Sequence, residues 1–167
     1  MAVDVLFVTR DDIVRFTAMN GNVDVDKYLQ FVKIAQDLHI QGYLGTKLYQ
    51  KLKDEITAGT LVNPYLSLLD TYIKPMVIHF SMIEYLPFAS YVIGNKGVYK
   101  YTSENGEIVG KEEVDQLIEK ERDIADHYVQ RFLDHICYNQ STYPEYYENS
   151  NGDIYPTTKN NFNGWYI

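Results

Sequence analysis

Residues 34–52 read IAQDLHIQGYLGTKLYQKL, and two glycines near the middle, in GYLGTK at 42–47, decide how this stretch folds. A phosphate-binding Walker loop needs Gly-x-x-x-x-Gly-Lys-Ser/Thr between a strand and a helix, so that backbone N–H groups surround the phosphates. Here the order is Gly-Thr-Lys, the spacing is shorter, and the pattern before the glycines is that of an amphipathic helix. The stretch therefore argues against a nucleotide site.

A Gly-x-x-Gly clamp for single-stranded nucleic acid also lies between two helices. Its two middle residues should face solvent and phosphate, whereas here they are Tyr43 and Leu44, and the chain has a formal charge of −8. We therefore expect a structural corner, in which Gly42 ends one helix and Gly45 allows the chain to reverse. Tyr43 and Leu44 would pack inward, and Thr46 would cap the helix that follows.

Helices are predicted on both sides of this corner. Residues 26–41 form the clearest amphipathic helix, whose apolar face contains Tyr28, Phe31, Val32, Ala35 and Leu38. Similar spacing predicts further helices at about 10–18, 46–58, 63–93 and 111–137. The hydroxyl of Thr9 followed by acidic residues favours the start of the first of these.

The predicted helix at 63–93 is apolar on several faces and contains Pro75 and Pro87. We expect it to be the buried central helix, kinked or split at the prolines. Its most apolar part, residues 75–94, is interrupted by His79 and Glu84, so a buried core helix fits it better than a membrane span. In the helix at 111–137, only Glu121 breaks the apolar stripe.

Two segments lack the helical pattern. Residues 97–110, GVYKYTSENGEIVG, alternate and contain Asn105-Gly106, the strongest short hairpin signal, so we predict a β-hairpin at about 97–109. Residues 139–167 have two aliphatic side chains but seven aromatic ones, which is unusual for a disordered tail. We interpret them as an extended arm that docks on another surface, and the alternative is a tail packed on its own domain.

The predicted fold is thus mainly α: a helical bundle of about five helices with one β-hairpin and an extended, aromatic C-terminal arm. We divide it into a helical domain at 1–138, with the hairpin inserted, and the arm at 139–167.

A chain of 167 residues can bury roughly 70% of its unfolded surface and needs no disulfide or metal. With Cys137 as the single cysteine an internal disulfide is impossible, which fits a reducing compartment. No signal peptide is expected from the N-terminal residues.

No catalytic, cofactor or metal site is predicted. Asp123 and His127 are four residues apart and could share a helix face, but nothing nearby completes a set of metal ligands. His135 and Cys137 are two residues apart and point to different sides of a helix, so we expect Cys137 to be a small core residue.

Several stretches together resemble one known family. They are LFVTRDDI at 6–13, NGNVD at 20–24, the stretch at 34–52, and YPEYY at 143–147. In this order they resemble the head–tail connector proteins of tailed bacteriophages, and most closely the ring proteins beneath the portal in crAss-like phages and related phages of Bacteroidetes. The resemblance is strongest at Ala35-Gln36, Leu44-Gly45-Thr46 and Leu48-Tyr49.

The resemblance implies a non-enzymatic, α-helical subunit without a cofactor. Such subunits form a closed ring, usually twelvefold, that binds the portal protein and the tail or neighbouring ring proteins and helps to retain and pass the genome. It also implies a virion protein that is assembled in the host bacterial cytoplasm and has no membrane partner. An acidic lumen would let genomic DNA pass without specific binding. The alternative function is a small helical regulator or interaction module, dimeric and binding a peptide or nucleic acid.

A ring requires heterologous contacts, in which one face of a subunit meets a different face of its neighbour. The chain has 16 tyrosines, and aromatic side chains are enriched at interfaces. The candidates for contacts between subunits or with the portal are Tyr99, Tyr101, Tyr143, Tyr146, Tyr147, Phe162, Trp165 and Tyr166.

Overall fold

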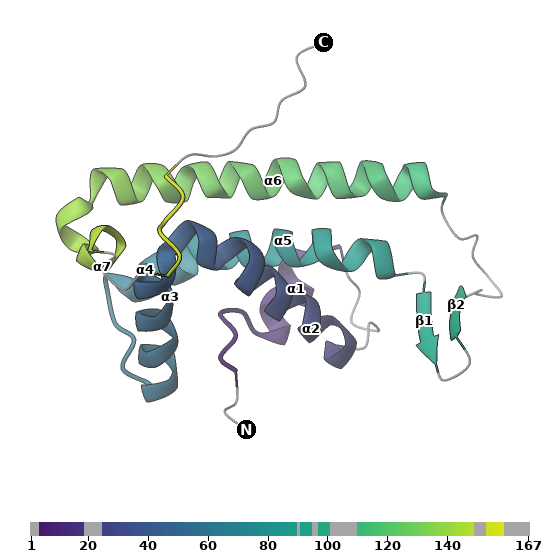
Figure 1. Cartoon of the computed structure of the whole chain (residues 1–167), viewed down its shortest axis with the longest axis horizontal. Coiled ribbons are helices and arrows are strands. Elements are labelled where there is room, and N and C mark those ends of the chain that lie inside the picture. The colour runs from purple at the N-terminus through teal and green to yellow at the C-terminus, as the bar shows by residue number, and fades with distance from the viewer. Residues whose placement is uncertain are drawn as a thin grey trace, which may run out of the picture.

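The computed structural model describes residues 4–18, 25–89, 91–94, 97–100, 110–148 and 153–158. The longest helix is α6 (Lys111–Tyr138), and α5 (Lys74–Tyr85) runs beside it (Figure 1). On its other side, α5 packs against α2 (Val25–Ala35), which makes α5 the centre of a helical bundle. Among the described residues, no helix combines the length and apolarity needed to cross a membrane.

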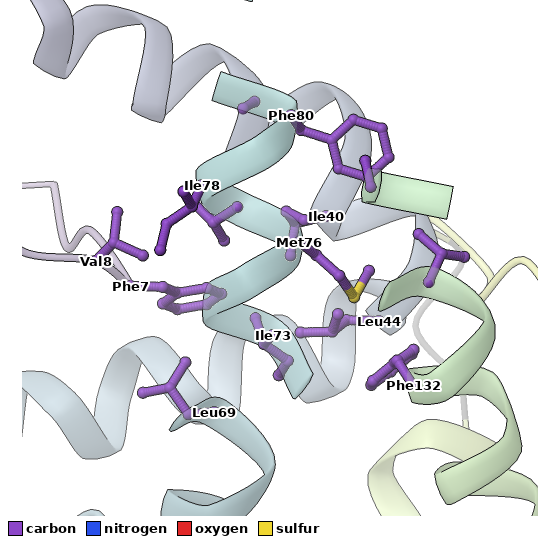
Figure 2. Packing of buried hydrophobic residues seen from close by; sticks show 14 of the residues in the cluster. Phe7, Val8, Ile40, Leu44, Leu69, Ile73, Met76, Ile78, Phe80 and Phe132 are labelled. Carbon is purple, nitrogen blue, oxygen red and sulfur yellow. The ribbon is translucent and has the colours of Figure 1, made fainter. Parts of the chain in front are cut away.

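The N-terminal helix α1 (Arg10–Phe16) begins where its cap predicts. The Thr9 hydroxyl accepts a hydrogen bond from the Asp12 backbone N–H, and the Asp12 carboxylate accepts one from the Thr9 N–H. This reciprocal pair satisfies two N–H groups that the first helical turn leaves without partners. Just before it, Phe7 and Val8 enter the core beside Ile73 and Ile78 (Figure 2).

No gap separates the second and third predicted helices. Helix α2 continues through a π-helical turn, η1 (Gln36–Ile40), into α3 (Gln41–Ala58). The break lies inside α3 at Gly45, whose φ of 72° and ψ of 154° are not helical. Gly59 ends α3 in a left-handed conformation with φ of 66°, as the predicted end at about residue 58 requires.

The predicted central helix is split, as expected from its prolines. It consists of α4 (Tyr65–Leu68), a π-helical turn η2 (Leu69–Ile73), α5, and a 3₁₀ turn η3 (Leu86–Phe88). Pro75 lies in the first turn of α5, directly after the π-helical turn η2. Ile73, Met76 and Phe80 project from this region into the core (Figure 2).

Two of the three polar interruptions of the apolar faces are partners of each other, and the third, Glu84, pairs with His39. His79 of α5 and Glu121 of α6 lie 2.7 Å apart, between Nδ1 and Oε2, and both side chains are largely buried. Each residue breaks an apolar pattern in its own helix, but together they satisfy one another where α5 meets α6. Burying an ionisable group beside a hydrogen-bonding partner avoids most of the desolvation cost that it would otherwise carry.

The predicted hairpin at 97–109 is wrong. Strand β2 (Gly97–Lys100) pairs in antiparallel fashion with β1 (Tyr91–Gly94), which precedes it, and Gly94 faces Gly97 at the closed end. The prediction assigns residues 91–93 to the central helix, and Asn105-Gly106 lies outside the described residues. Alternation with period two identifies a strand but does not select its partner, so the pattern at 97–100 was compatible with pairing on either side.

After α6 the chain folds back onto the bundle. A 3₁₀ turn, η4 (Gln140–Thr142), leads into α7 (Pro144–Tyr147), which packs against α3. Tyr143 and Tyr146 are only 2% and 4% exposed and belong to the core. The described part of the predicted extended arm is therefore a segment packed on its own domain, because its tyrosines complete a core that the helices alone leave open.

Candidate functional site

Gln36 attaches the N-terminal segment to the α2–α3 helix. Its side chain is fully buried: Oε1 accepts a hydrogen bond from the Phe7 N–H at 2.7 Å, and Nε2 donates to the Val5 carbonyl at 3.0 Å. The same Nε2 lies 3.3 Å from the hydroxyl of Tyr49. A buried backbone group without a partner costs about 1–3 kcal/mol, so this single amide stabilises the segment on which Phe7 enters the core.

Tyr49 extends this network toward the surface. Its hydroxyl donates to Asp37 at 3.1 Å, and its ring meets Phe7 edge to face. Burial, opposed in part by the hydrogen bond from Gln36, raises the pKa of Tyr49 to about 12. The phenol therefore stays protonated near neutral pH and serves as a fixed donor.

The break at Gly45 creates a binding site for another part of the chain. In an uninterrupted α-helix, the N–H of Thr46 would donate to the carbonyl of Gly42. Here residues 153–158, which we call the C-terminal strap, form hydrogen bonds with both the Thr46 N–H and the Gly42 carbonyl. The Thr46 N–H donates to the Ile154 carbonyl at 3.1 Å, and the Gly42 carbonyl accepts from the Thr157 N–H at 2.8 Å.

Pro156 fills the space beside Gly45. A Cβ atom at position 45 would lie 2.6 Å from Cγ of Pro156 and 2.7 Å from its Cδ, too close for any side chain. Glycine is thus required twice, by the positive φ and by this contact. The Thr46 hydroxyl adds a hydrogen bond to Asp153 at 2.7 Å, and Lys47 pairs with Glu148 at 3.1 Å.

The predicted corner is confirmed at Gly45 and Leu44, and two of its details are wrong. Leu44 is fully buried, and Tyr43 is half-buried against Phe80. Gly42, however, remains helical, and a Cβ there would meet nothing within 4 Å. Thr46 binds the strap instead of capping its helix. Sequence alone did not indicate that a segment more than a hundred residues away would occupy this site.

The predicted contact residues fall into three groups. Tyr143 and Tyr146 are buried in their own protomer, so their assignment as exposed contact residues is wrong. Tyr147 is partly exposed, although its hydroxyl donates to the Ile136 carbonyl. The remaining candidates lie outside the part of the chain whose side chains are described, namely Tyr99, Tyr101, Phe162, Trp165 and Tyr166.

Two more expectations require correction. Leu38 was assigned to the buried face of its helix but is 67% exposed, because the π-helical turn at Gln36–Ile40 changes the helical phase. Cys137 is exposed rather than buried, since the neighbouring Ile136 takes the core position. Sequence reasoning therefore missed an apolar surface at Leu38.

A hollow of about 490 Å³ lies among α1, η2, α5 and α6, beside His79. Three of its charged groups pair with one another: Lys74 contacts Asp70 at 2.7 Å and Asp12 at 3.7 Å. Burial alone would raise the pKa of Asp12, but hydrogen bonds from Thr9 and the charge of Lys74 lower it. These pairs join α1, η2 and α5 across the hollow.

Among the residues that the structure describes, no group of three or more His, Cys, Asp or Glu side chains could hold a metal ion. Asp123 and His127 both lie on the exposed face of α6. The predicted pair therefore shares a helix face, but no third ligand joins it within the described parts of the chain.

Comparison with known proteins gives one match. No curated protein and no solved structure matches the chain. A family model described as "Family of unknown function (DUF6712)" matches residues 40–156, from the last residue of η1 to the proline of the strap. The match ends at Pro156, the residue that meets Gly45, and so contains both sides of that contact. Because it covers more than half of the 167 residues, the chain belongs to the family DUF6712.

Proposed function

We propose that the protein is a structural, non-enzymatic subunit of a head–tail connector ring in a tailed bacteriophage. In this role it joins the portal to the tail or to neighbouring ring proteins, and it helps to retain the genome and pass it during ejection. It is assembled in the host cytoplasm and ends in the virion. The basis of the proposal is the resemblance of several stretches of the chain to such connector proteins.

One observation carries the proposal: the residues of the resemblance are those that hold distant parts of the chain together. Gln36 binds the N-terminal segment, and Gly45 and Thr46 bind the strap. The stretch YPEYY at 143–147 contains α7, which packs on α3. The stretches that carry the resemblance thus include residues that make long-range contacts in this chain, and this supports the proposal.

The surface of α6 suits a subunit that faces DNA without binding it. Acidic residues outnumber basic ones on its exposed surface: six acidic residues are exposed, namely Glu112, Glu113, Asp115, Glu119, Asp123 and Asp134, against the four basic residues Lys111, Lys120, Arg122 and Arg131. Like charges repel at these distances unless salt screens them, so DNA would slide past such a surface with little adhesion. We propose that this face of α6 lines or borders the lumen of the ring.

The decisive experiment is the mass of the protein in solution, alone and mixed with the portal protein of the same phage. We expect the mixture to contain a closed ring whose copy number follows the portal, usually twelve. Native mass spectrometry and electron microscopy measure both quantities. A stable dimer that binds DNA and ignores the portal would contradict the proposal and favour a small helical regulator.

A further inference from the structure

One flank of α2 carries several exposed apolar side chains. We call it the α2 stripe and define it as Phe31, Ile34, Leu38 and Phe88. Ile34, Leu38 and Phe88 are 37%, 67% and 51% exposed, while Phe31 is nearly buried beneath Phe88, with ring centres 5.5 Å apart. Three of the four residues follow one another at spacings of three and four along α2 and η1, which places them on one side of the helix.

The stripe differs from the scattered apolar residues found on most surfaces. The adjacent flank of α2 is buried against α5 through Tyr28 and Val32, so the apolar surface continues outward from the core. Tyr91 of β1, 48% exposed, follows Phe88 by three residues. Contiguous apolar surface of this kind generally marks an interaction site.

The chain itself contains a segment whose chemistry fits this surface. Residues 159–167, KNNFNGWYI, which we call the tail, follow the strap and contain Phe162, Trp165, Tyr166 and Ile167. The one side chain among these nine residues that is charged at neutral pH is Lys159. A nine-residue segment can span about 30 Å when extended, which is enough to cross the length of the stripe.

The strap determines where the tail starts. The Thr157 N–H is bound to the Gly42 carbonyl, one helical turn beyond Leu38. In Figure 1 the strap crosses the broken helix toward α6, away from β1 and the turn η3 that contains Phe88. Because the described strap runs away from the stripe of its own protomer, the stripe of a neighbouring subunit is the better match for the residues that follow it.

We propose that the α2 stripe of one copy receives the tail, residues 159–167, of a second copy. Tail and stripe are different surfaces, so the contact is heterologous and can repeat around a ring. The inference rests on the proposed function for its geometry, because a head-to-tail contact is what a ring of identical subunits requires. It deepens that function by naming both sides of the contact.

The first test uses Trp165, the single tryptophan of the chain. We expect its emission maximum to move to shorter wavelengths as the protein is concentrated, in parallel with an increase in sedimentation mass. Leu38→Glu should abolish both changes. The matched control is Leu117→Glu on α6, which alters a leucine that is 51% exposed and lies outside the stripe, and it should preserve both.

A mixing experiment separates a contact between copies from one within a copy. One full-length partner is Leu38→Glu, which keeps its tail and Trp165 but has a blocked stripe. The other is Phe162→Ser/Trp165→Ser, which has an intact stripe and no tryptophan. Trp165 emission of the first should shift when the second is added, and should not shift when more of the first is added.

Two results overturn the proposal: Trp165 emission that is independent of protein concentration, or a mixture whose emission equals that of its parts. Circular dichroism checks that Leu38→Glu stays folded, and Ile34→Gln is the second variant if it does not. The portal experiment remains separate. Rings that form equally well with Leu38→Glu would refute the contact and leave the connector function standing, whereas docking of Trp165 without portal binding would do the reverse.

Discussion

The two ends of the chain are attached to the same helix by different physical means. The N-terminal segment is held by one buried side chain, Gln36, whose amide matches the backbone groups of Phe7 and Val5. The C-terminal strap is held nine residues later by backbone groups that the break at Gly45 leaves free. The attachment of the N-terminal segment depends on the amide side chain of Gln36. The attachment of the strap depends on the absence of a side chain at Gly45.

This difference teaches where each attachment should be sensitive to mutation. An attachment made by a side chain is weakened when the hydrogen-bonding groups of that side chain are removed, because the buried backbone groups are then left without hydrogen-bond partners. An attachment at a helix break fails when any Cβ is added, because the backbone conformation and the close contact with Pro156 both exclude it. Each variant below should disturb one attachment and spare the other.

The largest effect is expected for Gly45→Val, which should lower the free energy of unfolding by about 3 kcal/mol through backbone strain and overpacking. It should also increase hydrogen exchange at the Thr157 N–H, since the strap is displaced. Urea unfolding measures the free energy of unfolding, and hydrogen-exchange mass spectrometry measures exchange at the Thr157 N–H. The control is Gly42→Ala, which should be neutral or stabilising by up to about 1 kcal/mol, because Gly42 is helical and has open space. Equal stabilities of the two variants would contradict the role of Gly45.

A smaller loss, about 2 kcal/mol, is expected for Gln36→Leu, which leaves the buried Phe7 N–H and Val5 carbonyl without partners. Exchange at the Thr157 N–H should stay slow in this variant, in contrast to Gly45→Val. Gln30→Leu, an exposed substitution on α2, should change the stability by no more than about 0.5 kcal/mol. If Gln36→Leu were as mild as Gln30→Leu, the N-terminal segment would not depend on the amide.

The smallest effect at neutral pH is expected for Tyr49→Phe, about 1 kcal/mol from the lost hydrogen bonds. Because the folded pKa of Tyr49, about 12, lies above its ordinary value of 10, its contribution is fully present below pH 10 and is lost as the pH rises toward 12. Tyr49→Phe should therefore lose less stability between pH 10 and 12 than the wild type. Part of the slope should remain, since burial also raises the pKa of Tyr146 to about 12. Thermal unfolding of both proteins between pH 10 and 12 measures how stability changes with pH. Identical pH dependence in the wild type and Tyr49→Phe would contradict the burial of the Tyr49 hydroxyl.

Much of the helical framework could be predicted because its signals are local. The cap at Thr9, the break at Gly45 and the end of α3 at Gly59 each follow from conformational preferences of one residue and its neighbours within a turn. The helix at Lys111–Tyr138 follows from apolar spacing over many turns. The phase of Leu38 was missed because a single extra residue in a π-helical turn rotates the helix face without altering the composition.

The candidate site was only half visible in the sequence. The corner at Gly45 was expected, but its ligand, the strap, was assigned to an arm that would dock elsewhere. Pro156 and Tyr146 look like ordinary residues of an aromatic segment, and nothing local to them states which surface they bury. The contact is visible only in the structure, where Pro156 occupies the space that a Cβ atom at Gly45 would fill.

The sequence by itself determined where the helices start, break and end, because these depend on interactions between residues within about four positions of each other. The tertiary structure alone decided which segments meet: His79 with Glu121, β2 with β1, and the strap with the broken helix. Such pairings are chosen by the free energy of burying surfaces that lie far apart in the chain. That free energy depends on the shape of the assembled core, which no single stretch of sequence contains.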